Sequence, residues 1–293
     1  MSRIGVMFDR DRAPEELPAF AKAMEEAGID DLWVVEDLGW AGSISSAAIA
    51  LAATSRIRVG IGIAPAPLRN PALLAMELAM LARVYPGRVV GGLGHGVPEW
   101  MRQVGVERKA KLALLEESVV AVRGLLNGET VTLHGREVHI DGVKLVHPPA
   151  VVPPIVTGVV QPRSLELSGR VADGTIIPEG RGPKELAEAL EHVRRGGASA
   201  DHDAILFALL HVSDDPEAAE KETGELVRIQ ASWLGVDPAD VFSLIGPASE
   251  FPAKVRAATE AGMTSLVLRP LGADPVGQVR ATLAALTHPP TED

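Results

Sequence analysis

Two titratable side chains follow segments with the pattern of buried strands, and parallel α/β folds carry their chemistry at such strand ends. Asp37 ends the run Trp33-Val-Val-Glu-Asp, and His95 lies between two glycines after Arg88–Leu93. The carboxylate is a candidate general base, an acceptor for a ring N–H, or a plain loop residue. The imidazole is a candidate acid, a hydrogen-bond donor to substrate, or a satisfied buried histidine. Asp37 and His95 are therefore the candidate catalytic residues.

A glycine-rich strand with a stiff exit occupies residues 56–71, RIRVGIGIAPAPLRNP. Its β-branched residues alternate with small ones, and Gly60 and Gly62 leave the backbone bare. A buried strand tolerates glycine where something lies close against the main chain. The pattern predicts either a flat ligand or tight packing at the end of this strand. Asn70 and Pro71 suit the start of the next helix.

A possible anion site begins at Gln161-Pro-Arg163, because free N–H groups at a helix start and a guanidinium together hold a phosphate. The run Gly94-His95-Gly96 superficially suggests a dinucleotide loop. It lacks the third glycine and the acidic strand end expected downstream, so a nicotinamide site is disfavoured. Trp40 and Trp100 follow strand-like segments and predict either an apolar lid over a planar ring or a dimer contact.

Other polar residues have simpler explanations. Glu77, within an apolar helix, is expected to be a paired structural carboxylate. His211 is expected to be a polar strand end. No spacing of His, Asp or Glu has metal-ligand character, and neither G-x-S-x-G nor a P-loop occurs. No metal site is predicted.

Strand-like and helix-like segments alternate along the whole chain, which favours a closed parallel (β/α)8 barrel of the α/β class over an open sheet. No linker or repeat is visible, so residues 1–293 are predicted to form a single domain with insertions. Residues 97–111 are expected to be a loop, and 130–146 an insertion of short strands. The expected barrel strands are Arg3–Phe8, Asp31–Val35, 57–63, Arg88–Leu93, Ile155–Thr157, Gly174–Ile177, Ala204–Val212 and Ser265–Leu268.

In such barrels the chemistry lies at the C-terminal ends of the strands. That rule selects a short list of positions: Asp9, Glu36, Asp37, 62–66, 94–97, 158–161, Pro178, Glu179, His211 and Arg269.

Composition limits the classes of partner. The 293 residues include no cysteine, which removes disulfides and thiolate sites and is compatible with a reducing cytoplasm. The net charge of −11 disfavours nucleic acid and anionic membranes as partners. The apolar runs are much shorter than the roughly 20 residues of a membrane span, and no signal peptide is apparent.

Four segments resemble the bacterial-luciferase-like superfamily of flavin- and deazaflavin-dependent oxidoreductases. They are the acid that closes strand two in 33–37, the run Gly60-Ile-Gly-Ile-Ala-Pro-Ala-Pro-Leu-Arg-Asn-Pro71, the run Pro86-Gly-Arg-Val-Val-Gly-Gly-Leu-Gly-His-Gly96, and 153–174, ending Leu-Ser-Gly-Arg-Val-Ala-Asp-Gly. The segments at 245–247 and 261–270 agree with the C-terminal end of the family. The likeness covers nearly the whole chain and is closer to the methylenetetrahydromethanopterin reductase branch.

The resemblance implies a (β/α)8 barrel with an insertion near strand seven, a homodimer, and a non-proline cis peptide under the redox ring. By position that peptide is Gly62–Ile63. It also implies a cofactor site along the barrel mouth, with its phosphate end near 160–163. The implied cofactor-binding residues are Asp37, Gly62, Ile63, Ala64, Gly94, Gly96, Val97, Val160, Gln161 and Arg163.

The resemblance favours coenzyme F420 as the cofactor, with FMN as the alternative. The family's histidine after the acid is Leu38 here, and the glutamate of a sugar-phosphate dehydrogenase branch is Val97. That branch's substrate therefore does not carry over. The implied activity is hydride transfer between F420 and a small organic substrate. The alternatives are an FMN monooxygenase that uses reduced flavin and O2, and a non-catalytic barrel that acts as a binding protein.

Overall fold

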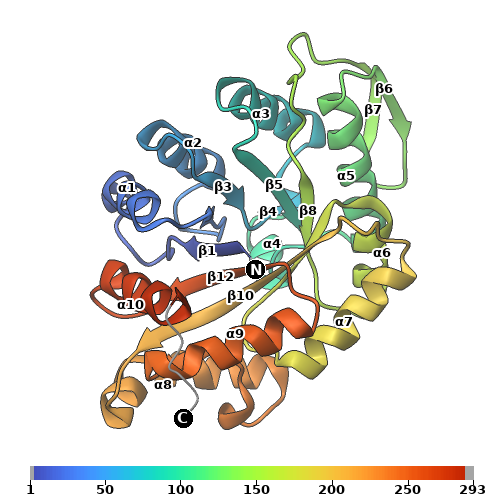
Figure 1. Ribbon diagram of the computed structural model, residues 1–293. Coiled ribbons are helices and arrows are strands. Elements are labelled where there is room, and N and C mark those ends of the chain that lie inside the picture. The colour runs from blue at the N-terminus through green and yellow to red at the C-terminus, as the bar shows by residue number, and fades with distance from the viewer. Residues whose placement is uncertain (1–2, 288–293) are drawn as a thin grey trace.

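Eight parallel strands close into a barrel in the computed structural model, which describes residues 3–287 (Figure 1). Closure occurs at β10, which pairs in parallel with β9 on one side and with β12 on the other. The predicted (β/α)8 fold is therefore confirmed. The barrel strands are β1 (Arg3–Met7), β2 (Asp31–Val34), β3 (Arg58–Ile61), β5 (Val89–Gly94), β8 (Ile155–Gly158), β9 (Gly174–Ile177), β10 (Asp203–Val212) and β12 (Ser265–Pro270).

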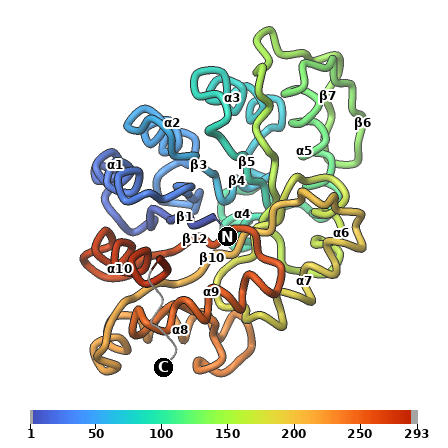
Figure 2. The backbone as a smooth tube through the Cα atoms, in the orientation of Figure 1, coloured from blue at the N-terminus to red at the C-terminus, as the bar shows by residue number. Residues whose placement is uncertain are grey.

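Helices surround the barrel as an outer ring in Figures 1 and 2. They form where apolar residues recur with the helical period, and their ends follow the local chemistry. Asn70 accepts a hydrogen bond from the Ala72 N–H, and Gly28 ends a helix with φ 87°. The helices are α1 (Leu17–Ala27), α2 (Ser43–Ala53), α3 (Pro71–Val84), α5 (Lys111–Leu126), α6 (Pro162–Val171), α7 (Pro183–Arg195), α8 (Pro216–Leu234), α9 (Phe251–Glu260) and α10 (Pro275–Thr287).

The insertion predicted after α5 is an antiparallel hairpin of β6 (Val131–His134) and β7 (His139–Val143), which lies outside the helix ring (Figure 1). The short strands expected over 130–146 do not continue past Val143. Further pieces are β4 (Ala64–Pro65), β11 (Leu244–Gly246) and the 3-10 turns η1 (Pro14–Glu16), η2 (Ala66–Leu68), η3 (Pro238–Asp240) and η4 (Ala248–Glu250).

The fold differs from the sequence analysis in two further places. Residues 97–111 are not simply a loop, since α4 (Pro98–Gln103) forms there with proline in its first turn. The strand β11 was not predicted. It pairs with the end of β10 through Leu210 and Leu244, and its three residues are too few to give a periodic signal. With α8, it makes up the extra chain between β10 and β12, the insertion near strand seven that the family resemblance implied.

The barrel interior has its own small core, separate from the larger core between strands and helices. Trp33 and Phe207 meet there edge to face, with ring centroids 5.6 Å apart. A Cβ added at Gly60 would lie 2.4 Å from the Trp33 indole. Gly60 is therefore explained by tight packing, one of the two alternatives that its sequence context left open.

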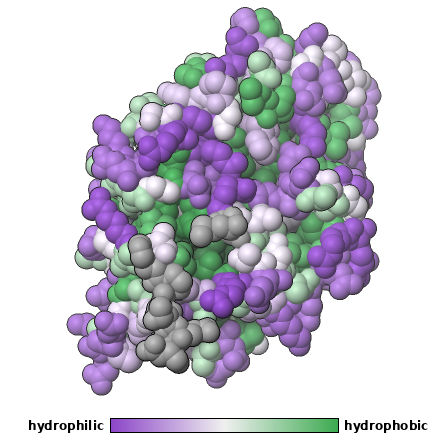
Figure 3. Space-filling model, in the orientation of Figure 1, coloured by the Kyte–Doolittle hydropathy of each residue, from purple (hydrophilic) through white to green (hydrophobic). Residues whose placement is uncertain are grey.

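Hydrophilic residues cover the outer edge of the face shown in Figure 3, in keeping with a chain that is 23% charged. Among residues 3–287, no helix combines the length and the hydropathy that crossing a bilayer requires.

Candidate functional site

A cavity of about 480 Å³ opens at the C-terminal ends of the barrel strands, and main chain forms part of its floor. The peptide between Gly62 and Ile63 is cis, as the family resemblance implied, and both residues line the cavity. A Cβ on Gly62 would lie 2.8 Å from Cζ of Phe207 and 3.0 Å from Cε3 of Trp33. The floor is therefore bare of side chains because the barrel core leaves no room for one there.

The side chain of Ile63 lies in a slot made by glycines of neighbouring strands. A Cβ on Gly94 would lie 2.8 Å from its Cδ1, and a Cβ on Gly158 would lie 2.7 Å from its Cγ2. These glycines give the Ile63 side chain space beside the floor. The position of Ile63 thus depends on glycines that lie 31 and 95 residues further along the chain.

Most of the strand-end residues selected from the sequence come together at this cavity. Those that line it are Glu36, Asp37, Gly62, Ile63, Pro65, His95, Gly96, Val97, Gly158, Val159, Val160, Gln161, Pro178, Glu179 and Arg269. Three candidate cofactor residues do not line it. Ala64 is buried in β4, Gly94 lies beneath Ile63, and the exposed Arg163 lies in the first turn of α6. His211 is buried away from the cavity, with Nδ1 3.5 Å from the Leu271 carbonyl oxygen.

Asp37 is ion-paired where it meets the cavity. Nη1 of Arg10 donates a hydrogen bond to Oδ2 of Asp37 at 2.5 Å, and the Arg10 guanidinium lies 4.4 Å from the ring centre of Trp40. Trp40 in turn lies 6.2 Å from Trp100, and its Nε1 donates to Asp11. The carboxylate is therefore held in one orientation by a cation that is itself held by an aromatic ring.

Its neighbour Glu36 belongs to a structural ion network. Arg69 donates two hydrogen bonds to Glu36 and one to Glu77, at 2.7 to 3.0 Å. Ser43 at the start of α2 also donates to Glu36. The prediction that Glu77 is a paired structural carboxylate is confirmed. This network ties the loops after β2 and β3 together and so fixes one wall of the cavity.

His95 lies half-buried beside the start of α6, with Nε2 3.1 Å from Oγ of Ser164. Burial lowers the pKa of His95, and the positive charge of Lys111 lowers it further. The imidazole is therefore neutral at pH 7. A neutral ring that bonds a hydroxyl can pass or accept a proton at the cavity wall.

Arg269 forms a second paired group at the mouth. Its Nε donates to Asp9 at 2.6 Å, and its Nη1 lies 3.5 Å from Oε1 of Glu179. Burial alone lowers the pKa of Arg269, but the charges of Asp9 and Glu179 outweigh it and raise the pKa above its ordinary value. All three side chains are largely buried, so the group is a fixed, charged part of the cavity wall.

Several cavity residues were missed from the sequence. Arg10 comes three residues after β1, and only its neighbour Asp9 was selected. Helix α8 contributes four further side chains, Leu226, Ile229, Gln230 and Trp233. A signal for three of them existed, because 226, 229 and 233 recur with the helical period. The sequence does not show what this face of α8 contacts. In the fold, Gln230 donates a hydrogen bond to the Glu179 carbonyl oxygen, which places the face over the mouth of the barrel.

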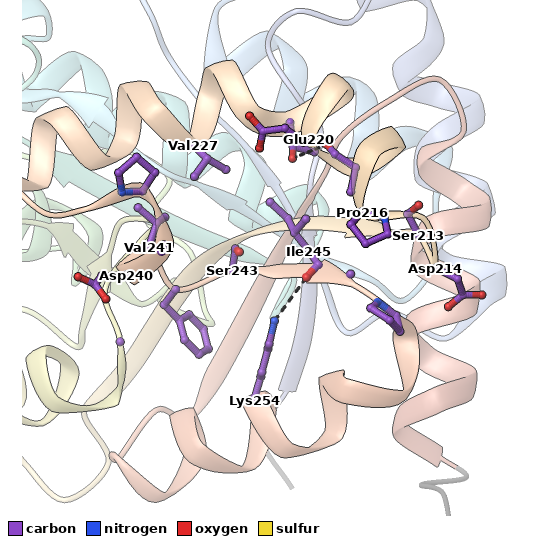
Figure 4. Close-up of a pocket in the computed structure, with 18 of the residues that line it drawn as sticks. Ser213, Asp214, Pro216, Glu220, Val227, Asp240, Val241, Ser243, Ile245 and Lys254 are labelled. Atoms are coloured by element: carbon purple, nitrogen blue, oxygen red, sulfur yellow. Dashed lines mark hydrogen bonds between the residues drawn. The ribbon is translucent and has the colours of Figure 1, made fainter.

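A second cavity, of about 580 Å³, lies between α8 and α9, bordered by the segment 238–247 (Figure 4). Lys254 reaches across it and donates to the Ile245 carbonyl oxygen at 3.4 Å. Glu220 and Val227 of α8 lie on its opposite wall. The cavity holds none of the strand-end residues selected above. Helix α8 therefore separates two cavities.

Among the residues that the structure describes, neither the mouth cavity nor the second cavity has the side chains that a metal site needs. Across residues 3–287, no group of three or more His, Asp or Glu side chains is arranged to hold an ion. The mouth cavity instead combines a flat main-chain floor, paired charges and apolar walls. Such a cavity suits a planar organic molecule.

This barrel and cavity define the class of the protein. A family model described as luciferase-like monooxygenase matches residues 1–281, so the chain belongs to that family. It is 25% identical over 288 residues to the 5,10-methylenetetrahydromethanopterin reductase of Methanolobus tindarius, with 85% of this chain and 88% of that protein covered.

Two further comparisons agree with this family. The chain is 30% identical over 235 residues to the F420-dependent glucose-6-phosphate dehydrogenase of Nakamurella multipartita, with 72% of this chain and 67% of that protein covered. The solved structure of the F420-dependent tetrahydromethanopterin reductase from Methanopyrus kandleri superposes with a TM-score of 0.85. The two chains are 18% identical, and 96% of each is covered, so they share the fold.

Proposed function

We propose that this chain is an oxidoreductase that transfers a hydride between coenzyme F420 and a small organic substrate at the barrel mouth. The observation that carries the proposal is the main-chain floor at Gly62–Ile63, which borders a cavity of about 480 Å³. The names of the reductase and dehydrogenase relatives support F420 as the cofactor. In this proposal, residues 1–293 form a single barrel domain.

The residues around the cavity fit a planar ring with an anionic tail. Gly62 and Ile63 offer a flat surface for the ring, and Asp37 offers a fixed acceptor for a ring N–H. The tail would run past Gly96 and Val97 to Val160 and Gln161, at the start of α6, where helix N–H groups favour negative charge. In this proposal Arg163 meets the tail at the surface, while Ala64 and Gly94 support the floor from below.

The bound deazaflavin supplies the two-electron hydride chemistry, and the protein supplies orientation and electrostatics. Asp37, held by Arg10, fixes the register of the ring. Trp100 and the apolar side chains of α8 exclude water from the reacting face. His95 would accept a proton from the polar atom of the substrate as the hydride leaves, and return that proton in the reverse reaction, because its imidazole is neutral and bonded to Ser164.

Titration of the purified protein with each cofactor tests the proposal. We expect F420 to bind and its absorbance at about 420 nm to shift, while FMN, followed at about 450 nm, binds more weakly. Stronger binding of FMN, with O2 consumption on reduction, would instead support the monooxygenase alternative that the family description suggests. If neither cofactor binds, the oxidoreductase proposal fails and the non-catalytic alternative is left.

The proposal includes a homodimer in the cytoplasm, a compartment compatible with a cysteine-free chain. An apolar stripe on α3 supports the dimer, since Leu73, Met76 and Met80 are 51%, 57% and 64% exposed. We expect Met80→Glu to convert a dimer to a monomer in sedimentation velocity, while Lys22→Glu on α1 leaves the dimer intact. A wild-type monomer at every concentration would refute this part.

A further inference from the structure

The mouth cavity has an apolar wall on the side of β9. Leu226, Ile229 and Trp233 project from one face of α8, which is tied to the end of β9 by the hydrogen bond from Gln230 to Glu179. Ile229 and Trp233 are 50% and 76% exposed although both line the cavity. Two large apolar side chains thus face water at the rim of a binding site. A ligand that covers them removes apolar surface from water, which favours binding.

Each charged residue of the cavity wall is already held by a residue of opposite charge. Arg10 and Arg269 are the only Lys or Arg side chains that line it within residues 3–287. Arg10 holds Asp37. Arg269 holds Asp9 and Glu179, and the remaining lining carboxylate, Glu36, is held by Arg69. No lining cation is left without a carboxylate.

These pairings decide which substrates the cavity can accept. An anionic substrate would have to take a guanidinium from its carboxylate, and the released carboxylate would stay in the cavity wall without a partner. A neutral substrate leaves every ion pair intact. Its apolar parts contact Leu226, Ile229 and Trp233, and one polar group is enough to meet the His95 side of the cavity.

We propose that the substrate of this site is a neutral, largely apolar organic molecule covered by Ile229 and Trp233, and that phosphorylated or carboxylated substrates are excluded. This inference rests on the proposed function, because it concerns the space left beside the cofactor. The proposed substrate class differs from that of the relative named for glucose 6-phosphate, a substrate that carries two negative charges at neutral pH.

The test uses the full chain loaded with oxidised F420 and two probes. Nile red is neutral and apolar and fluoresces when it leaves water, and glucose 6-phosphate is the anionic competitor. We expect Nile red to bind and glucose 6-phosphate not to displace it. Trp233→Ala should weaken Nile red binding about tenfold, the loss expected when a large aromatic contact is removed. Ser232→Ala, the adjacent exposed position on the same helix, should leave it unchanged.

A second variant keeps the inference testable if Trp233→Ala folds poorly. Ile229→Ala should weaken Nile red binding in the same direction by about threefold, because its side chain offers less apolar surface. Displacement of Nile red by glucose 6-phosphate would overturn the inference, as would Nile red binding that neither variant changes. The F420 titration is read separately, so failure of cofactor binding identifies failure of the proposed function and not of the substrate class.

Discussion

Nη1 of Arg10 lies 2.5 Å from Oδ2 of Asp37, so the acid that follows β2 reaches the cavity already paired with a cation. Trp40 stacks on the same guanidinium and restricts its movement. A carboxylate fixed in this way is well suited to accept a hydrogen bond and poorly suited to remove a proton. Between the roles that the sequence left open for Asp37, the pairing favours an acceptor for a ring N–H over a general base.

This pairing predicts that Arg10 and Asp37 act as one unit in cofactor binding. We expect Asp37→Asn and Arg10→Met each to weaken F420 binding about tenfold, because each removes a charge-assisted hydrogen bond of the unit. The double variant should be no weaker than the worse single variant. Arg12→Met is the matched control, since Arg12 pairs with Glu16 and does not line the cavity. Additive losses in the double variant would contradict the prediction.

The bare floor at Gly62 gives a second prediction. Gly62→Ala places a methyl group 2.8 Å from Phe207, so we expect the free energy of unfolding to fall by about 1 to 3 kcal/mol, as overpacking usually costs. Phe207→Leu in the same chain should relieve the clash and recover part of the stability. Urea titration measures both effects. Gly42→Ala is the control, because its added methyl group would meet only Ser45 Oγ, at 3.5 Å.

The same pair of variants separates stability from cofactor binding. If the ring lies on the Gly62 main chain, Gly62→Ala should still bind F420 weakly after Phe207→Leu has restored stability. F420 binding that recovers together with stability would place the ring elsewhere in the cavity.

The sequence predicted the barrel well because its signals are local. Strand ends, helix caps and the glycines of 56–71 depend on residues close in the chain, and the rule that barrel chemistry lies at strand ends selected Glu179 and Arg269 without further information. The predicted edges of the strand Gly174–Ile177 coincide with the observed edges of β9, which begins at a glycine.

The remaining parts of the site depend on contacts between distant segments. Glycines 94 and 158 make room for Ile63, and Arg10 reaches Asp37 across a loop. No local pattern encodes these contacts. Trp233 is an exposed residue on a polar helix when viewed in sequence, and only its position over β9 makes it part of a cavity. The sequence therefore located the floor and the strand ends but not the wall that selects the substrate.

The lowered pKa of His95 predicts how stability changes with pH. An unfolded histidine binds a proton below pH 6.5, whereas burial keeps folded His95 neutral to lower pH. The unfolded chain then holds more protons, so this residue contributes stability above pH 6.5 that is lost as the pH falls. We expect His95→Gln to show a smaller fall in melting temperature than the wild type between about pH 7.5 and about pH 5.5. The melting temperature of His147→Gln, a change at an exposed position, should fall as much as that of the wild type.

Helix α8 separates two cavities, and its packing predicts how it moves. The buried residues of this 19-residue helix are all small: Ala219, Thr223, Gly224 and Ala231. Helix α5, in contrast, buries nine residues, six of which are leucine or valine. With little apolar surface buried and a cavity on each side, one of which is drawn in Figure 4, α8 should open more easily than α5. We expect backbone amides of α8 to exchange with solvent at least about tenfold faster than those of α5 in hydrogen-exchange mass spectrometry. Nile red with F420 should slow exchange in α8 and leave α5 unchanged, because Leu226, Ile229 and Trp233 of α8 line the cavity and no residue of α5 does. Equal protection of the two helices without ligand would show that α8 is a rigid wall.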